Sequence, residues 1–228
     1  MQVTIDPAGL AFLQASRLAI ALARPSPSPD VGSALAFALD AANVIGRSFA
    51  VTVQPELCCF VTSGLFNPMQ TVTPALLSAS IDRAAIGDTG AVASFDGSRL
   101  DLGTSDAVPG MLLVHNGGRN DNVTIGLAET FANTADNATA QAPTLLRALA
   151  RNTIWALDEL PTDAWLFTIS ASTPVGTIVP SQFFVPKPLG KATRAKVSVT
   201  ASTALRVDLS DESLKVTYNA ATHRFVPG

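Results

Sequence analysis

Two histidines, His115 and His223, are the natural candidates for a general base beside a serine or cysteine nucleophile. His115 ends an apolar stretch in front of a glycine-rich turn, and His223 lies in the C-terminal tail. Neither stands in a known catalytic frame, and the sequence contains no Gly-x-Ser-x-Gly elbow. We therefore expect His115 to be a strand-end residue. An enzyme that uses His115 with a loop aspartate is the third of three functional hypotheses.

Oxygen ligands for a hard cation gather in two turn-rich stretches. These are Asp96, Asp101 and Asp106 in one, and Asn116, Asn120, Asp121 and Asn122 in the other. Calcium takes six to eight oxygen ligands from such loops, but Asp and Asn are also ordinary turn residues. The sequence has no zinc-type Cys/His spacing and no phosphate-binding glycine loop. We predict no cofactor, no metal and no catalytic residues.

The two cysteines, Cys58 and Cys59, are adjacent within an apolar run. Neighbouring residues of a strand point to opposite faces, so a disulfide between them would be strained. We expect two buried free thiols.

The segment after Pro180 has two interpretations, two rings packed in the core, which we favour, and a contact with other proteins. In a peripheral strand one ring of Phe183-Phe184 would point outward and could anchor a partner. The possible interface residues are Phe183, Phe184, Lys187 and Lys191.

The N-terminal elements are predicted to be helical. Asp6-Pro7 is a good helix start, and helical spacing of leucines favours a helix over residues 8–23. We interpret this segment as part of the mature protein rather than a signal peptide, because its apolar run is short. Alternating Pro and Ser at 24–30 form a link to a second helix at about 33–45. These elements make up an N-terminal segment, 1–47, before the main domain, 48–228.

The remainder of the sequence alternates in the manner of strands. The clearest are residues 48–53 and 57–62, a hairpin around Asp96-Gly97, and a final meander over 197–218. Leucines at helical spacing predict one amphipathic helix near 144–159. The fold class is therefore α+β, an antiparallel β-rich sheet or sandwich with two N-terminal helices and this third one.

Charge is scarce: only 14% of the 228 residues are Asp, Glu, Lys or Arg, against about 25% in an average domain. A surface so short of charge resists association poorly, so either neighbouring subunits cover much of it or the chain is a neutral extracellular or environmental protein. Residues 187–228 carry 7 basic and 3 acidic side chains, too few for direct binding of nucleic acid. No apolar run is long enough to span a membrane.

These observations favour a structural subunit of a large assembly, most plausibly a viral or phage capsid shell or a capsid-decorating protein, located in the virion. Its partners would be copies of itself or other shell proteins. The alternative is a secreted or surface-exposed β-rich binding module, lectin-like or adhesin-like. The glycosylation sequons at Asn122 and Asn137 would fit that extracellular setting.

Overall fold

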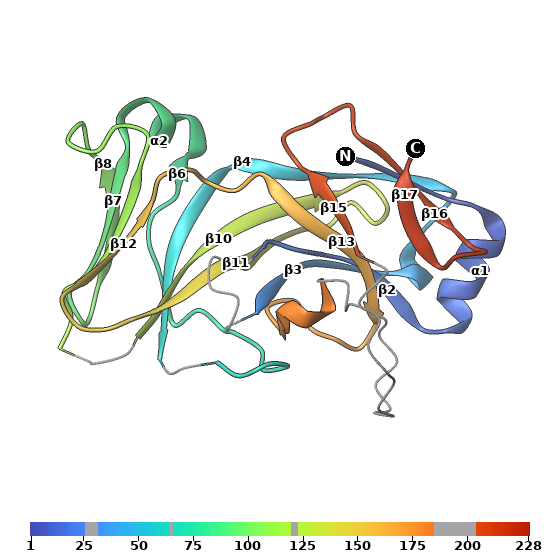
Figure 1. Ribbon diagram of the computed structural model, residues 1–228, viewed down its shortest axis with the longest axis horizontal. Coiled ribbons are helices and arrows are strands. Elements are labelled where there is room, and N and C mark those ends of the chain that lie inside the picture. Colours follow the sequence, from blue (N-terminus) through green and yellow to red (C-terminus); the bar gives the residue numbers. More distant parts are fainter. Residues whose placement is uncertain (26–31, 64–65, 120–122, 185–203) are drawn as a thin grey trace.

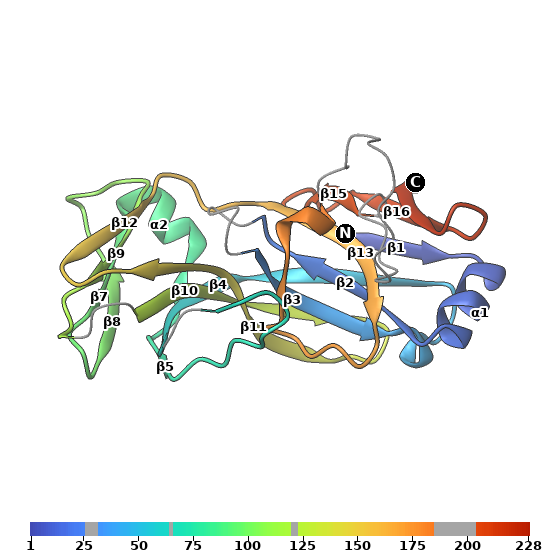
Figure 2. The same cartoon turned by 60° about the horizontal axis from the view of Figure 1, so that its bottom comes forward.

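Three β-sheets form most of the chain and are arranged along one long axis (Figure 1). The computed structural model describes residues 1–25, 32–63, 66–119, 123–184 and 204–228. Figure 2 shows a small sheet and α2 at one end of this axis, and α1 at the other end. The protein is therefore β-rich and broadly α+β.

The largest sheet has the strand order β11-β10-β4-β1-β16-β17, with two short strands, β5 and β6, paired to β4. Its strands are β1 (Gln2–Ile5), β4 (Ser48–Ser63), β5 (Leu76–Leu77), β6 (Ile81–Asp82), β10 (Val123–Asn133), β11 (Thr139–Leu149), β16 (Lys215–Asn219) and β17 (Arg224–Pro227). Strands β1 and β16 are parallel, and the other pairs are antiparallel. Since β4 has 16 residues, it extends past β1 to pair with β10 over most of its length.

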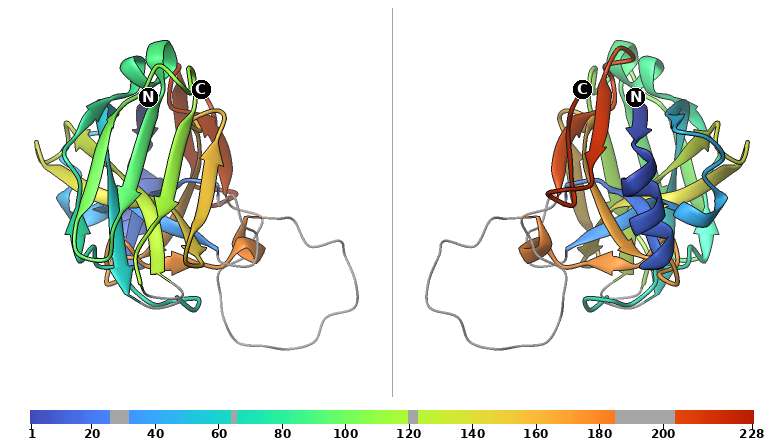
Figure 3. Two further views of the ribbon diagram at one scale, coloured as in Figure 1. Left: turned by 90° about the vertical axis from the view of Figure 1, so that its left-hand side faces the viewer. Right: turned by 90° about the vertical axis from the view of Figure 1, so that its right-hand side faces the viewer.

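Two further sheets pack against the first. One has the order β14-β3-β2-β13-β15 and is antiparallel; the other has the order β12-β9-β7-β8, with β7 and β9 parallel. The five-stranded sheet consists of β2 (Leu18–Ala23), β3 (Ser33–Asp40), β13 (Asp163–Ser170), β14 (Ile178–Val179) and β15 (Leu205–Asp208). The four-stranded sheet, seen from its end of the molecule in Figure 3 (left), consists of β7 (Ala91–Phe95), β8 (Leu100–Thr104), β9 (Leu112–Asn116) and β12 (Thr153–Leu157).

The described ranges contain two α-helices, α1 (Pro7–Ala15) and α2 (Arg83–Thr89), and two 3-10 turns, η1 (Ala41–Asn43) and η2 (Ser181–Phe183). The predicted start of the first helix is confirmed, because the Asp6 carboxylate caps α1 by accepting the Gly9 N–H at 2.7 Å. The helix ends at Ala15 with Ser16 as its C-cap, and Arg17 then turns the chain through a positive φ of 52° into β2.

The central strands of the large sheet contribute to separate hydrophobic cores on their two faces. One core, which includes Phe131 and Tyr218, is shared with the five-stranded sheet. Another, which includes Cys59 and Trp155, is shared with the four-stranded sheet. Cys58 belongs to a third cluster together with Ile178 of β14. Burial on both faces explains why β4 and β10 contain continuous apolar runs rather than an alternating pattern.

The two thiols are free and buried, as predicted, and they lie in different clusters. Burial, with a smaller contribution from Cys58, raises the pKa of Cys59 to about 12. Because the thiolate is the reactive form, we expect Ellman's reagent at pH 8 to label Cys59 in the native protein at least about 100-fold more slowly than in denaturant. Rapid labelling of both thiols in the folded protein would contradict this burial.

The second N-terminal helix and the helix near 144–159 are wrong, and the first helix is right only as far as residue 15. Residues 18–23 and 33–40 are β2 and β3, which pair with each other over most of their length. Residues 144–159 contain the end of β11, a turn, and β12. Residues 18–23 and most of 33–40 are buried on both faces, and residues 144–159 are divided between two strands, so in neither region does the apolar spacing specify a helix.

The other strand predictions are largely confirmed. Residues 48–53 and 57–62 form the single strand β4, and the Asp96-Gly97 hairpin joins β7 to β8. The C-terminal meander is wrong, because β15 pairs with β13 while β16 pairs with β1 and β17, in a different sheet. Residues 197–203 of that meander lie outside the described ranges. The N-terminal segment 1–47 is interleaved with the remainder, since β1 pairs with β4 and β16.

Candidate functional site

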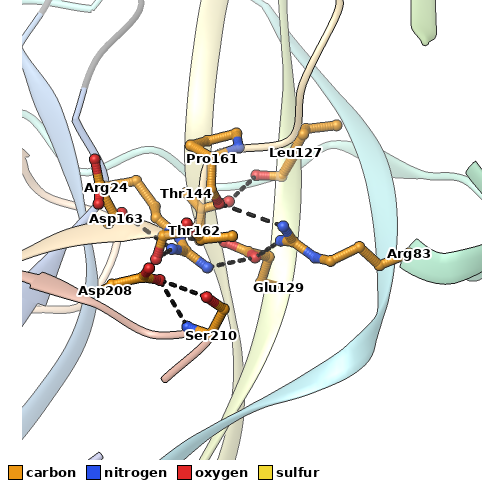
Figure 4. A network of polar contacts seen from close by, with 10 residues as sticks. All are labelled: Arg24, Arg83, Leu127, Glu129, Thr144, Pro161, Thr162, Asp163, Asp208 and Ser210. Carbon is orange, nitrogen blue, oxygen red and sulfur yellow. Dashed lines mark hydrogen bonds and ion pairs between the residues drawn. The ribbon is translucent and has the colours of Figure 1, made fainter. Parts of the chain in front are cut away.

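A buried cluster of charged side chains lies where the large sheet meets the five-stranded sheet (Figure 4). Arg24 directly follows β2, Glu129 lies in β10, and Arg83 is the first residue of α2. The Arg24 guanidinium binds the carboxylate in a bidentate manner, with Nε to Oε2 at 2.9 Å and Nη2 to Oε1 at 2.8 Å. Arg83 forms an ion pair with the same Oε1 atom. One carboxylate therefore holds two guanidinium groups.

The remaining contacts of the two arginines are with backbone carbonyls at the start of β13. Arg24 Nη1 donates to the carbonyl oxygens of Thr162 at 2.6 Å and Asp163 at 3.0 Å, and Arg83 Nη1 donates to that of Pro161 at 3.3 Å. Bidentate charge-assisted hydrogen bonds of this kind fix geometry as well as adding energy. The network thus ties α2 and β10 to β2 and β13, two neighbouring strands of the five-stranded sheet.

Local features of the chain place each member of the cluster. The pairing of β10 with β4 shifts in register between Glu129 and Phe131, and such a bulge re-aims the side chains beside it. The Asp82 carboxylate caps α2 by accepting the Ala84 N–H at 2.7 Å, which starts the helix at Arg83.

The cluster carries one more positive than negative charge. The exposed fraction of the side chain is 2% for Arg24 and 4% for Glu129, but 26% for Arg83. Burial lowers the pKa of Arg83, the Glu129 charge opposes that shift, and the Arg24 charge adds to it. The excess charge therefore lies at the one member of the cluster that reaches solvent.

Arg83 and Arg24 form part of the wall of a cleft of about 660 Å³. Polar side chains around it include Gln2, Thr52, Gln54, Ser210 and Glu212. Beside the cleft, hydrogen bonds from the Ser210 hydroxyl and N–H lower the pKa of Asp208. Since the cleft offers charges of both signs, amides and a hydroxyl, it suits a polar or zwitterionic small molecule better than a polyanion.

The interface residues predicted from the sequence are placed only in part. Phe184 is buried, with its ring stacked on Trp165 at 5.6 Å and edge-on to Phe167 at 5.3 Å. Phe183 is half-buried against the same cluster. Both rings therefore pack inward, the interpretation favoured above, while Lys187 and Lys191 lie outside the described residues. A contact role for this segment stays a prediction.

The histidines occupy separate places. His115 is a half-buried residue of β9, opposite Ile154 of β12 and Ser94 of β7. His223 stacks on Phe12 of α1, with ring centroids 4.0 Å apart. His115 thus lies within a strand near its end, as expected.

The turn-rich stretches are explained by local hydrogen bonds where they are described. The Asp96 carboxylate accepts the N–H groups of Ser98 and Arg99, each at 2.8 Å, which closes the hairpin and lowers the Asp96 pKa. Asn116 is buried, donates to the Leu149 carbonyl and accepts the Gly118 N–H. Across the described ranges, no three His, Cys, Asp or Glu side chains come together as a metal site would require.

Sequence reasoning did not find the Arg24–Glu129–Arg83 cluster. One signal was available: Glu129 is the single charged residue in the apolar stretch 123–133. A carboxylate in a strand buried on both faces needs a cationic partner. The sequence gives no means of choosing that partner, because Arg24 lies 105 residues away.

Comparison with family models, with curated proteins and with solved structures gave no match. Among the helices in the described ranges, none has the length and apolar character to cross a membrane.

Proposed function

We propose that this chain is a structural subunit of a large protein assembly, and that the assembly is the shell of a virus or phage, either as a shell component or as a protein that decorates it. The observation that carries the proposal is the low charge of the surface. Only 14% of residues are charged, and Arg24 and Glu129 are buried. The solvent-facing surface is therefore short of the groups that keep monomers apart.

Exposed apolar side chains support this proposal. Ile45 is 83% exposed, Ile154 60% and Met69 57%, and they lie in different parts of the chain. Single exposed apolar residues are common on monomers. On a surface with few charged groups, however, little charge repulsion or charge solvation opposes the contact of these residues with another protein. A subunit that touches several neighbours needs such surfaces on more than one side.

The partners in this proposal are copies of the same chain or other shell proteins, and the location is the virion. An outer-layer or accessory role fits best, because residues 187–228 carry only 7 basic side chains for contact with a genome.

The mass of the native particle tests the proposal. We expect light scattering and electron microscopy of a native extract to find the chain in particles many times the mass of one copy. A protein that stays strictly monomeric at high concentration, with no partner shell in the extract, would refute the assembly role.

A second candidate, a surface-exposed β-rich binding module, is favoured by the cleft beside Arg83. It predicts a free monomer that binds a polar ligand, such as a carboxylated sugar, with an affinity that falls in the variant Arg83→Met. The same measurement of particle mass separates the two candidates.

A further inference from the structure

The cleft beside Arg83 lies at an opening in the large sheet. On the side of β4 that faces away from β10, β4 pairs with β1 up to Ala50 and with β6 from Glu56. No strand of the described ranges pairs with residues 52–55 on that side. This open stretch is about 13 Å long at about 3.3 Å per residue. Each of its residues lines the cleft, so the cleft is bounded by an unpaired part of a strand edge.

Backbone polar groups face the cleft at this opening. The Val51 N–H donates to the Met1 carbonyl at 2.9 Å, so the backbone groups of Val51 point toward β1. Because the backbone groups of a strand alternate in direction, Val53 presents its N–H and C=O on the same side, where β1 no longer pairs with β4. One donor and one acceptor on an open edge match an amide group of a ligand.

Arg83 supplies a positive charge at the other end of the opening. Glu129 already binds Arg24 in a bidentate manner, so its single negative charge is shared by two guanidinium groups. Within the described part of the chain, no second carboxylate forms an ion pair with Arg83, and its Nε–H has no acceptor. The side chain is 26% exposed and lines the cleft. A half-buried cation of this kind favours an anionic ligand, because charge-assisted hydrogen bonds are about twice as strong as neutral ones.

The other wall of the cleft limits the charge of that ligand. The turn between β15 and β16 contributes Ser210 and Glu212, and Glu212 is exposed. A ligand with several negative charges would be repelled by Glu212, whereas a single carboxylate would satisfy Arg83. The volume of about 660 Å³ lies within the range of about 300–1,000 Å³ that is typical of small-molecule sites.

We propose that this cleft binds a small monocarboxylate that also carries an amide group, with the carboxylate on Arg83 and the amide on the backbone of Val53. The C-terminal residue of a short peptide and an N-acetylated sugar acid both have this chemistry. The inference rests on the second candidate function, whose cleft it assigns to a class of ligand, and it does not depend on the assembly role.

An NMR titration of the full chain with one probe from each source tests the ligand class. The probes are N-acetyl-alanyl-alanine and N-acetylneuraminic acid. We expect at least one of them to bind with a Kd of about 1 mM or lower. Its methyl ester, which has no charge, should bind roughly 10-fold or more weakly, and N-methylation of the ligand amide should also weaken binding. These changes are made in the ligand, so altered folding cannot explain the loss.

Variants of the protein test the role of Arg83. In Arg83→Met the acid and its ester should bind equally weakly, because the partner of the carboxylate has gone, and Arg83→Lys should restore part of the preference for the acid. The matched control is Arg99→Met, which changes a 74% exposed arginine outside the cleft and should keep the wild-type Kd. The urea midpoint of each variant confirms that it is folded. A preference for the acid that persisted in Arg83→Met would overturn the proposal.

The outcomes separate this inference from the assembly role. If neither probe bound at about 10 mM, ten times the highest expected Kd, the cleft would not be the site proposed. Large native particles found in that case would leave the assembly role standing. A free monomer that binds a probe through Arg83 would refute the assembly role and support the ligand site, and particles that bind it would support both.

Discussion

Replacing Glu129 by glutamine is expected to lower the free energy of unfolding by about 3–5 kcal/mol, because it leaves two arginines in a buried site without their counter-charge. The Arg24 side chain is only 2% exposed, so water cannot take the place of the carboxylate. Glutamine keeps nearly the same shape, and the loss therefore reports the missing charge rather than a cavity. Urea unfolding at neutral pH measures the effect.

An exposed ion pair supplies the matched control for Glu129→Gln. Arg99 and Asp101 are 2.6 Å apart, but their side chains are 74% and 58% exposed. Exposed pairs contribute about 0–1 kcal/mol, so Asp101→Asn should change stability by less than about 1 kcal/mol. Equal effects of Glu129→Gln and Asp101→Asn on stability would mean that the buried cluster stabilises the fold no more than an exposed ion pair does.

A double variant shows how the cluster acts as a unit. Arg24→Met removes one of the two cations, and it also removes the Arg24 hydrogen bonds to the Thr162 and Asp163 carbonyls, although the Thr162 carbonyl keeps the Leu209 N–H. Combined with Glu129→Gln, it should cost less than the sum of the two single changes, because one of the unpaired charges has gone. If the two free-energy losses simply added, the direct contact between Arg24 and Glu129 would not be contributing to stability as the structure implies.

Strands with local signals could be predicted from the sequence. The Asp96-Gly97 turn between alternating residues gave the β7–β8 hairpin, since the two strands are neighbours in the chain and in the sheet. The opposite orientation of Cys58 and Cys59 followed from strand geometry alone. In both cases the information lies within a few residues.

The errors have a common physical cause. Alanine and leucine favour helices by intrinsic propensity, yet residues 18–23 and 33–40 are strands because partners distant in sequence, such as β13, pair with them. Over 144–159, Leu146 and Ile154 fall at helical spacing by coincidence. They belong to different strands, separated by a turn in which Asn152 has a φ of 57°.

The charged cluster could not be assembled from the sequence for the same reason. Its three members lie in β10, at the end of β2 and at the start of α2, and only the fold brings them together.

Gly126→Ala is expected to destabilise the protein by about 3 kcal/mol or more, because the added methyl group would overpack a strand that is buried on both faces. A Cβ atom at Gly126 would lie 2.2 Å from the Leu145 carbonyl oxygen and 2.6 Å from the Phe60 ring. Phe60 is directly opposite Gly126 on β4, so its ring covers the backbone that the missing side chain leaves open. Leu145 belongs to the core shared with the four-stranded sheet and Phe60 to the cluster that contains Ile178, so neither neighbour can move without disturbing the packing around it.

Gly103→Ala in β8 is the matched control, since a Cβ atom there has nothing within 4 Å. It should change stability by no more than about 0.5 kcal/mol, as surface substitutions usually do. Phe60→Leu should recover part of the loss in the Gly126→Ala background, because it removes the ring while the Leu145 carbonyl remains. Calorimetry of the wild type, the two single variants and the double variant measures these effects. If Gly126→Ala unfolded at the same temperature as Gly103→Ala, the close approach of β10, β4 and β11 would be wrong. The packing of the large sheet, to which Glu129 of the buried cluster belongs, would then have to be different.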